Sequence, residues 1–101
     1  STDKRSVVLP DVPTTAEAGL KDASYVFWNG LFVPAKTPRD VIGKLYEETH
    51  KALAMPEVQE RLLKTGTEPL PLTTEQFDKY FRDDVTSTAK LMKEAGVQPT
   101  E

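Results

Sequence analysis

Apolar and polar positions follow the 3.6-residue helical period in three stretches of the chain. The first helix is predicted to begin near Thr37, which offers an N-cap hydroxyl, with Pro38 at the first helical position and Asp40 complementing the helix dipole. A second helix is predicted from Pro56, with Gly66 ending it. The apolar or small residues of the first helix fall on one face: Val41, Ile42, Leu45, Tyr46, Thr49, Ala52 and Leu53.

The third helical stretch is the longest. Thr73 and Gln76 have the spacing of a capping box, and apolar residues keep the helical period from there to Gly96. The aromatic residues at the start of this helix, Phe77, Tyr80 and Phe81, indicate a packing face rather than a cofactor site.

Residues 25–33 have a different pattern, dense in aromatic and β-branched side chains and closed by Pro34. This pattern predicts a strand that is buried on at least one face, and Gly30 within it indicates a bulge or a close backbone contact. A lone strand cannot satisfy its own backbone N–H and C=O groups. We therefore expect neighbouring strands from a second copy or from the rest of a larger α/β protein.

The opening stretch is an irregular connector, because Pro10 and Pro13 prevent a helix or central strand from running through it. Thr14 and Glu17 fit a second capping box, and Gly19 is placed to end the turn in a left-handed conformation. We expect one short helical turn between Thr14 and Gly19.

Length and charge narrow the function classes. The chain has 101 residues, so one domain is expected. Its net charge is -3, from 13 basic and 16 acidic residues, so no basic excess exists to attract nucleic acid, and none is expected as a partner. The absence of cysteine excludes disulfides, thiolate zinc sites and cysteine nucleophiles. No apolar run is long enough to span a bilayer, and no signal-peptide pattern opens the chain.

Candidate chemistry is sparse. His50 is the single histidine, and we interpret it as a partly exposed packing residue beside Tyr46 rather than a catalytic base. The adjacent acids Glu47–Glu48 and Asp83–Asp84 point about 100° apart on a helix and cannot clasp one metal ion. No catalytic residue, metal site or cofactor is predicted.

Two residues of the predicted strand are candidates for ligand contact. Trp28 could stack or donate its indole N–H, although core packing is the favoured interpretation. Asn29 faces the opposite side of a strand, where its amide could contact a polar ligand or cap a loop.

Several short motifs are spread over nearly the whole chain. They are Arg5-Ser6, residues 9–14, residues 16–19, residues 28–35, Thr37-Pro38, residues 51–54, Pro56-Glu57-Val58, residues 66–69 and residues 93–96. Together these motifs resemble the solute-binding proteins of the tripartite tricarboxylate transporters, the Bug or TctC-type family. The chain departs from the family pattern at Lys36, where the family commonly has Gly, and at Met55, where the family usually has an N-capping Asp.

The resemblance implies an α/β fold, in which this chain is the C-terminal third of a two-lobed protein of the periplasmic binding protein type II kind. Residues 1–24 would be a proline-rich interlobe connector with a short helical turn, bending at Pro10, Pro13 and Gly19. Residues 25–101 would be the C-terminal part of the first lobe, one strong strand and three helices.

The function implied by the resemblance is non-enzymatic. Such a protein is exported to the periplasm, its signal peptide lying outside this chain, and captures small carboxylic acids, tricarboxylates or dicarboxylates among them, for membrane permease subunits. Most ligand loops would belong to the missing N-terminal portion of the same protein. The alternative is a self-associating interaction module, a homodimer that pairs through its exposed strand and aromatic helix face.

Overall fold

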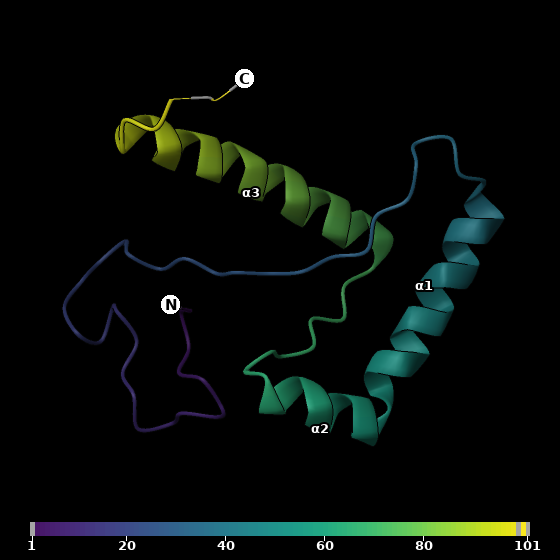
Figure 1. Ribbon diagram of the computed structural model, residues 1–101, viewed down its shortest axis with the longest axis horizontal. Coiled ribbons are helices and arrows are strands. Elements are labelled where there is room, and N and C mark those ends of the chain that lie inside the picture. The colour runs from purple at the N-terminus through teal and green to yellow at the C-terminus, as the bar shows by residue number, and fades with distance from the viewer. Residues whose placement is uncertain (1, 99, 101) are drawn as a thin grey trace. The chain divides into compact units, whose positions relative to one another are not determined.

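Three helices account for the regular structure of this computed structural model, which describes residues 2–98 and 100 (Figure 1). They are α1 (Arg39–Ala54), α2 (Pro56–Lys64) and α3 (Thr74–Glu94). The chain divides after Pro69 into two units, the first containing α1 and α2 and the second containing α3.

The capping box predicted for α3 is confirmed. The Gln76 N–H donates to Thr73 Oγ1 over 3.2 Å, and the Thr73 N–H donates to Gln76 Oε1 over 2.9 Å. The helix stops as predicted at Gly96, where the Val97 N–H donates back to the Met92 carbonyl over 2.9 Å. Local side-chain and backbone hydrogen bonds therefore define both ends of α3.

The start of α1 differs from the prediction. Thr37 was expected to cap this helix, but the N-cap is Pro38, with no side-chain cap. The Pro38 carbonyl accepts the first helical hydrogen bond, from the Ile42 N–H at 3.1 Å, so Thr37 lies one residue outside the helix.

The second helix begins at Pro56 and ends before Gly66, as predicted. Its N-cap is Met55, which makes no side-chain cap, as expected for a residue without a side-chain acceptor oxygen. The α1 and α2 helices contact each other, and Gln59 Nε2 donates across their junction to the Leu53 carbonyl over 2.9 Å.

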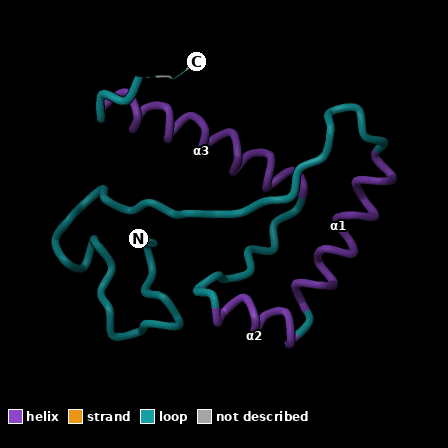
Figure 2. The backbone as a smooth tube through the Cα atoms, in the orientation of Figure 1, coloured by secondary structure: helices purple, strands orange, loops and turns teal. Residues whose placement is uncertain are grey.

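The predicted strand is wrong, and with it the α/β class. Residues 25–33 are extended but belong to no strand, and Figure 2 shows loop for all described residues outside the three helices. A strand needs a second extended backbone alongside it, and no such ladder forms among the residues that the structure describes. The described fold is therefore helical.

The described residues enclose no apolar core. None of their apolar side chains is buried, and Thr14, 9% exposed, is the one buried residue among them. The charged faces of the helices carry ion pairs one turn apart, including Lys44–Glu48, Arg61–Glu57, Lys64–Glu60 and Arg82–Asp78. Such exposed pairs add little stability, so the helices depend mainly on their own backbone hydrogen bonds.

Candidate functional site

The best-defined irregular structure is a loop closed by Arg5 and Glu17. Arg5 Nε donates to both oxygens of the Glu17 carboxylate, at 2.8 Å and 3.1 Å, and Arg5 Nη1 donates to the Pro10 carbonyl over 3.1 Å. These bonds join residues that lie 12 positions apart in the chain. Arg5 thus fixes the course of the proline-containing segment between the two ion-paired residues.

The loop ends in the predicted helical turn. The Thr14 N–H donates to Glu17 Oε2 over 2.8 Å, while the Glu17 N–H donates to Thr14 Oγ1 over 3.2 Å, which confirms the capping box. Gly19 follows with a φ of 91°, and its N–H donates to the Ala16 carbonyl over 3.0 Å. A helical turn commonly ends in a residue with left-handed backbone conformation, and glycine adopts that conformation without steric cost.

Glu17 is the electrostatic centre of the loop. The hydrogen bond from the Arg5 guanidinium is the largest influence lowering the pKa of its carboxyl group, and the bond from the Thr14 N–H adds to it. Glu17 therefore stays ionised at neutral pH, where it accepts from both donors. The charges of Arg5 and Glu17 offset each other, so the pair serves structure rather than acid–base chemistry.

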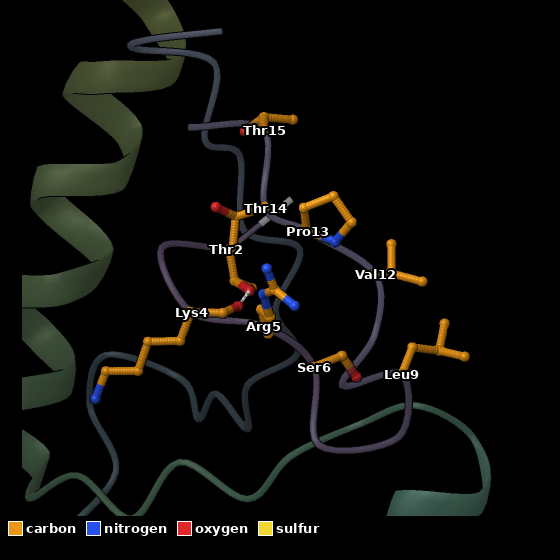
Figure 3. Close-up of a pocket in the computed structure, with 9 residues that line it drawn as sticks. All are labelled: Thr2, Lys4, Arg5, Ser6, Leu9, Val12, Pro13, Thr14 and Thr15. Carbon is orange, nitrogen blue, oxygen red and sulfur yellow. Dashed lines mark hydrogen bonds between the residues drawn. The ribbon is translucent and has the colours of Figure 1, made fainter. Parts of the chain in front are cut away.

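A pocket of about 240 Å³ lies against this loop, as Figure 3 shows. Apolar walls and hydroxyl groups dominate it, and its two basic residues are Lys4 and the already paired Arg5. The lining residues are Thr2, Lys4, Arg5, Ser6, Leu9, Val12, Pro13, Thr14 and Thr15. With one charge neutralised by Glu17, the pocket offers mainly hydroxyl hydrogen bonds and apolar contact.

The structure brings the three predicted bending residues into one ordered region. Pro10 accepts from Arg5, Pro13 lines the pocket, and Gly19 ends the helical turn. The two ligand candidates lie elsewhere: Trp28 is half-buried, and Asn29 is exposed. Neither is among the residues that line the pocket.

Sequence reasoning missed the structural role of Arg5. The residue was noticed as part of a family motif, but nothing periodic links two side chains 12 positions apart in an irregular segment. The available signal was the capping box, since a glutamate that caps a turn retains lone pairs for a nearby cation.

His50 has the packing role that the sequence indicated. Its ring lies 4.2 Å from the Tyr46 ring, centroid to centroid, and the residue is half-buried on α1. Its Nε2 is shielded from solvent without a hydrogen-bond partner. Within residues 2–98 and 100, no group of three or more potential ligands is arranged to hold a metal ion. No helix in the same part of the chain is both long and apolar enough to cross a membrane.

Comparison with known proteins identifies the family. The profile of the tripartite tricarboxylate transporter family receptor matches residues 1–97. A UPF0065 protein from Agrobacterium vitis is 40% identical over 99 residues, which cover 95% of this chain and 29% of the relative. A UPF0065 protein from Pseudomonas sp. is 38% identical over 87 residues, covering 85% of this chain and 26% of the relative. A third, from Bordetella pertussis, is 30% identical over 95 residues, or 94% and 29% of the two chains.

The chain spans less than a third of the length of these curated relatives. No solved structure matches it. The family match extends over almost the entire sequence, and it includes both the Arg5–Glu17 loop and all three helices. The chain belongs to the tripartite tricarboxylate transporter receptor family.

Proposed function

We propose that this chain is the C-terminal part of an extracytoplasmic solute-binding receptor that captures small carboxylic acids and delivers them to the membrane permease of a tripartite tricarboxylate transporter. The observation that carries the proposal is the receptor-family match over residues 1–97. The family is one of receptors rather than enzymes. Self-association as an alternative function draws no support from the family.

Most of the carboxylate site is proposed to lie in the N-terminal portion of the receptor, outside this chain. The relatives are more than three times as long as the matched segment, which leaves ample sequence for it. Trp28 and Asn29 remain proposed contacts from this chain, through an indole N–H and an amide that suit carboxylate oxygens.

Residues 1–24 are proposed to connect the two parts of the receptor, with bends at Pro10, Pro13 and Gly19. The Arg5–Glu17 ion pair supports this proposal, because it gives a proline-rich segment a fixed course. In such a connector the ion pair would hold the bends at Pro10 and Pro13 in place, and movement would pass through Gly19 and the residues after it, which lie outside the closed loop.

Thermal unfolding in the presence of carboxylic acids tests the proposal. We expect the full-length receptor that contains this chain to be stabilised by one of citrate, succinate or glutamate, by about 2.7 kcal/mol at a hundredfold excess over Kd, and to be unaffected by glycerol. The 101-residue chain alone should show no binding of the same acids in micromolar calorimetry. A receptor unaffected by every carboxylate, or micromolar binding by the chain alone, would contradict the proposal.

A further inference from the structure

Asn29 is the single asparagine of the chain, and Gly30 follows it directly. Both residues lie outside the three helices, and the Asn29 side chain is exposed to solvent. Within the part of the chain that the structure describes, no hydrogen bond holds the side-chain amide of Asn29 or the backbone N–H of Gly30. The two groups are therefore available to react with each other.

The side-chain amides of two glutamines are held more firmly. Gln59 Nε2 donates to the Leu53 carbonyl over 2.9 Å, and Gln76 Oε1 accepts from the Thr73 N–H over 2.9 Å. Both glutamines also lie in helices, where hydrogen bonds hold the peptide groups of the backbone. These two amides are fixed by structure, whereas that of Asn29 is not.

We propose that Asn29–Gly30 is a site of spontaneous covalent modification, at which Asn29 loses its side-chain amide through a cyclic imide. The backbone nitrogen of Gly30 gives its proton to a solvent base and attacks the side-chain carbonyl carbon of Asn29. A carbon–nitrogen bond forms, and the side-chain nitrogen takes a proton from solvent and leaves as ammonia. Water then opens the ring at either carbonyl, which leaves an aspartyl or an isoaspartyl residue at position 29.

The glycine at position 30 favours this reaction for a steric reason. Because glycine has no Cβ, its nitrogen is open to the preceding side chain, and its backbone reaches conformations that other residues rarely adopt. A helix or a strand would withhold the same nitrogen through a backbone hydrogen bond. Among the described residues the Gly30 N–H makes no such bond, so the local structure does not oppose the ring closure.

The product differs from the parent chain in charge. One carboxylate replaces a neutral amide, so the net charge of -3 becomes -4. Asn29 is also a proposed ligand contact, and a carboxylate at this position would repel a carboxylic acid ligand. That consequence rests on the proposed function, whereas the modification itself depends only on residues of this chain.

Mass spectrometry of the 101-residue chain after incubation at neutral pH tests the proposal. We expect a mass gain of about 1 Da, the difference between an amide and a carboxyl group, in the peptide that contains Asn29 and not in those that contain Gln59 or Gln76. Electron-transfer fragmentation should show both aspartyl and isoaspartyl linkages at position 29. The rate should rise with pH, because the attacking nitrogen must lose its proton.

Matched alanine variants isolate the role of Gly30. Gly30→Ala should slow the mass gain about tenfold or more, because a Cβ hinders the attacking nitrogen. Gly43→Ala makes the same change within α1 and should leave the rate at Asn29 unaltered. Far-UV circular dichroism of the Gly30→Ala chain should match that of the parent, because position 30 lies outside the three helices.

Three results would overturn the inference. They are no mass gain at Asn29, an aspartyl product without isoaspartyl, which indicates direct hydrolysis by water, or equal rates in the Gly30→Ala and Gly43→Ala chains. The failure of the proposed function is a separate result, because the mass change is measured without any ligand. A receptor that binds no carboxylate would refute the ligand class and leave the modification site intact.

Discussion

Replacing Thr73 by alanine should remove much of the helical population of α3. The change deletes the side-chain oxygen that accepts from the Gln76 N–H. Of the capping box, it leaves only the bond from the N–H of residue 73 to Gln76 Oε1. Loss of a threonine N-cap typically costs about 1 kcal/mol. No residue of α3 is buried, so the burial of apolar side chains contributes little to the stability of this helix within the described residues.

The magnitude follows from the helix–coil balance. A cost of about 1 kcal/mol lowers the equilibrium constant for helix formation about fivefold at 25 °C. An unsupported helix of this length is marginal in water, with coil and helix near balance. Starting from equal populations, the helical fraction of α3 would fall from about one half to about one sixth.

Residue-resolved ¹³C chemical shifts measure this fraction directly, and α1 serves as the reference within the same molecule. Thr74→Ala is the matched control, because Thr74 lies inside the helix and its hydroxyl reaches only the neighbouring Glu75 carboxylate, at 3.3 Å. That variant should keep or raise helicity, since alanine is the best helix former. Equal α3 helicity in the Thr73→Ala and Thr74→Ala chains would refute the reasoning.

Three further predictions follow from the loop and the missing core. Arg5 lowers the pKa of Glu17 in the closed loop, so the stabilisation from this pair should be complete above the ordinary glutamate pKa of about 4.3 and should disappear as the pH falls through the lower pKa that Glu17 has in the closed loop. The NMR signal of the Arg5 Nε–H reports whether the loop is closed. A signal that persists below that lower pKa, or that survives Glu17→Gln, would contradict this prediction. A Cβ at Gly19 or at Gly43 would meet nothing within 4 Å, so the two substitutions by alanine differ only in their backbone effect. Gly19→Ala should destabilise the turn by about 1–2 kcal/mol because the φ of Gly19 is 91°, whereas Gly43→Ala should stabilise α1 by about 0.5–1 kcal/mol. Amide exchange measures both effects, and effects of the same sign would contradict the backbone argument. Finally, calorimetry of the chain alone should show no cooperative unfolding transition with an enthalpy near the roughly 70 kcal/mol that is typical of a compact domain of this length. A transition of that enthalpy would show that a core forms.

The features that could be predicted from the sequence are those that depend on neighbouring residues. The capping boxes at Thr14 and Thr73 rest on contacts three positions apart, and the stops at Gly66 and Gly96 on contacts within one turn. The strand prediction at residues 25–33 failed because a strand depends on a second backbone, which no local pattern supplies.

The candidate site was predictable only in part, for the same reason. The turn that ends at Gly19 was expected from its spacing, whereas the bond from Arg5 to Glu17 crosses 12 positions of irregular chain. The ligand candidates Trp28 and Asn29 stay predictions, since their partners would belong to another part of the receptor.

The local hydrogen bonds that define both ends of α3 also bear on the order of assembly. Because these bonds join residues within a few positions of one another, the helix can form on the sub-microsecond timescale of isolated helices, before any distant contact exists. By contrast, the side chain of Phe27 is 84% exposed, and its burial would need a contact from a distant part of the receptor. During synthesis of such a receptor, residues 25–33 would be most open to aggregation in this interval, and a chaperone that protects the receptor would be expected to bind there.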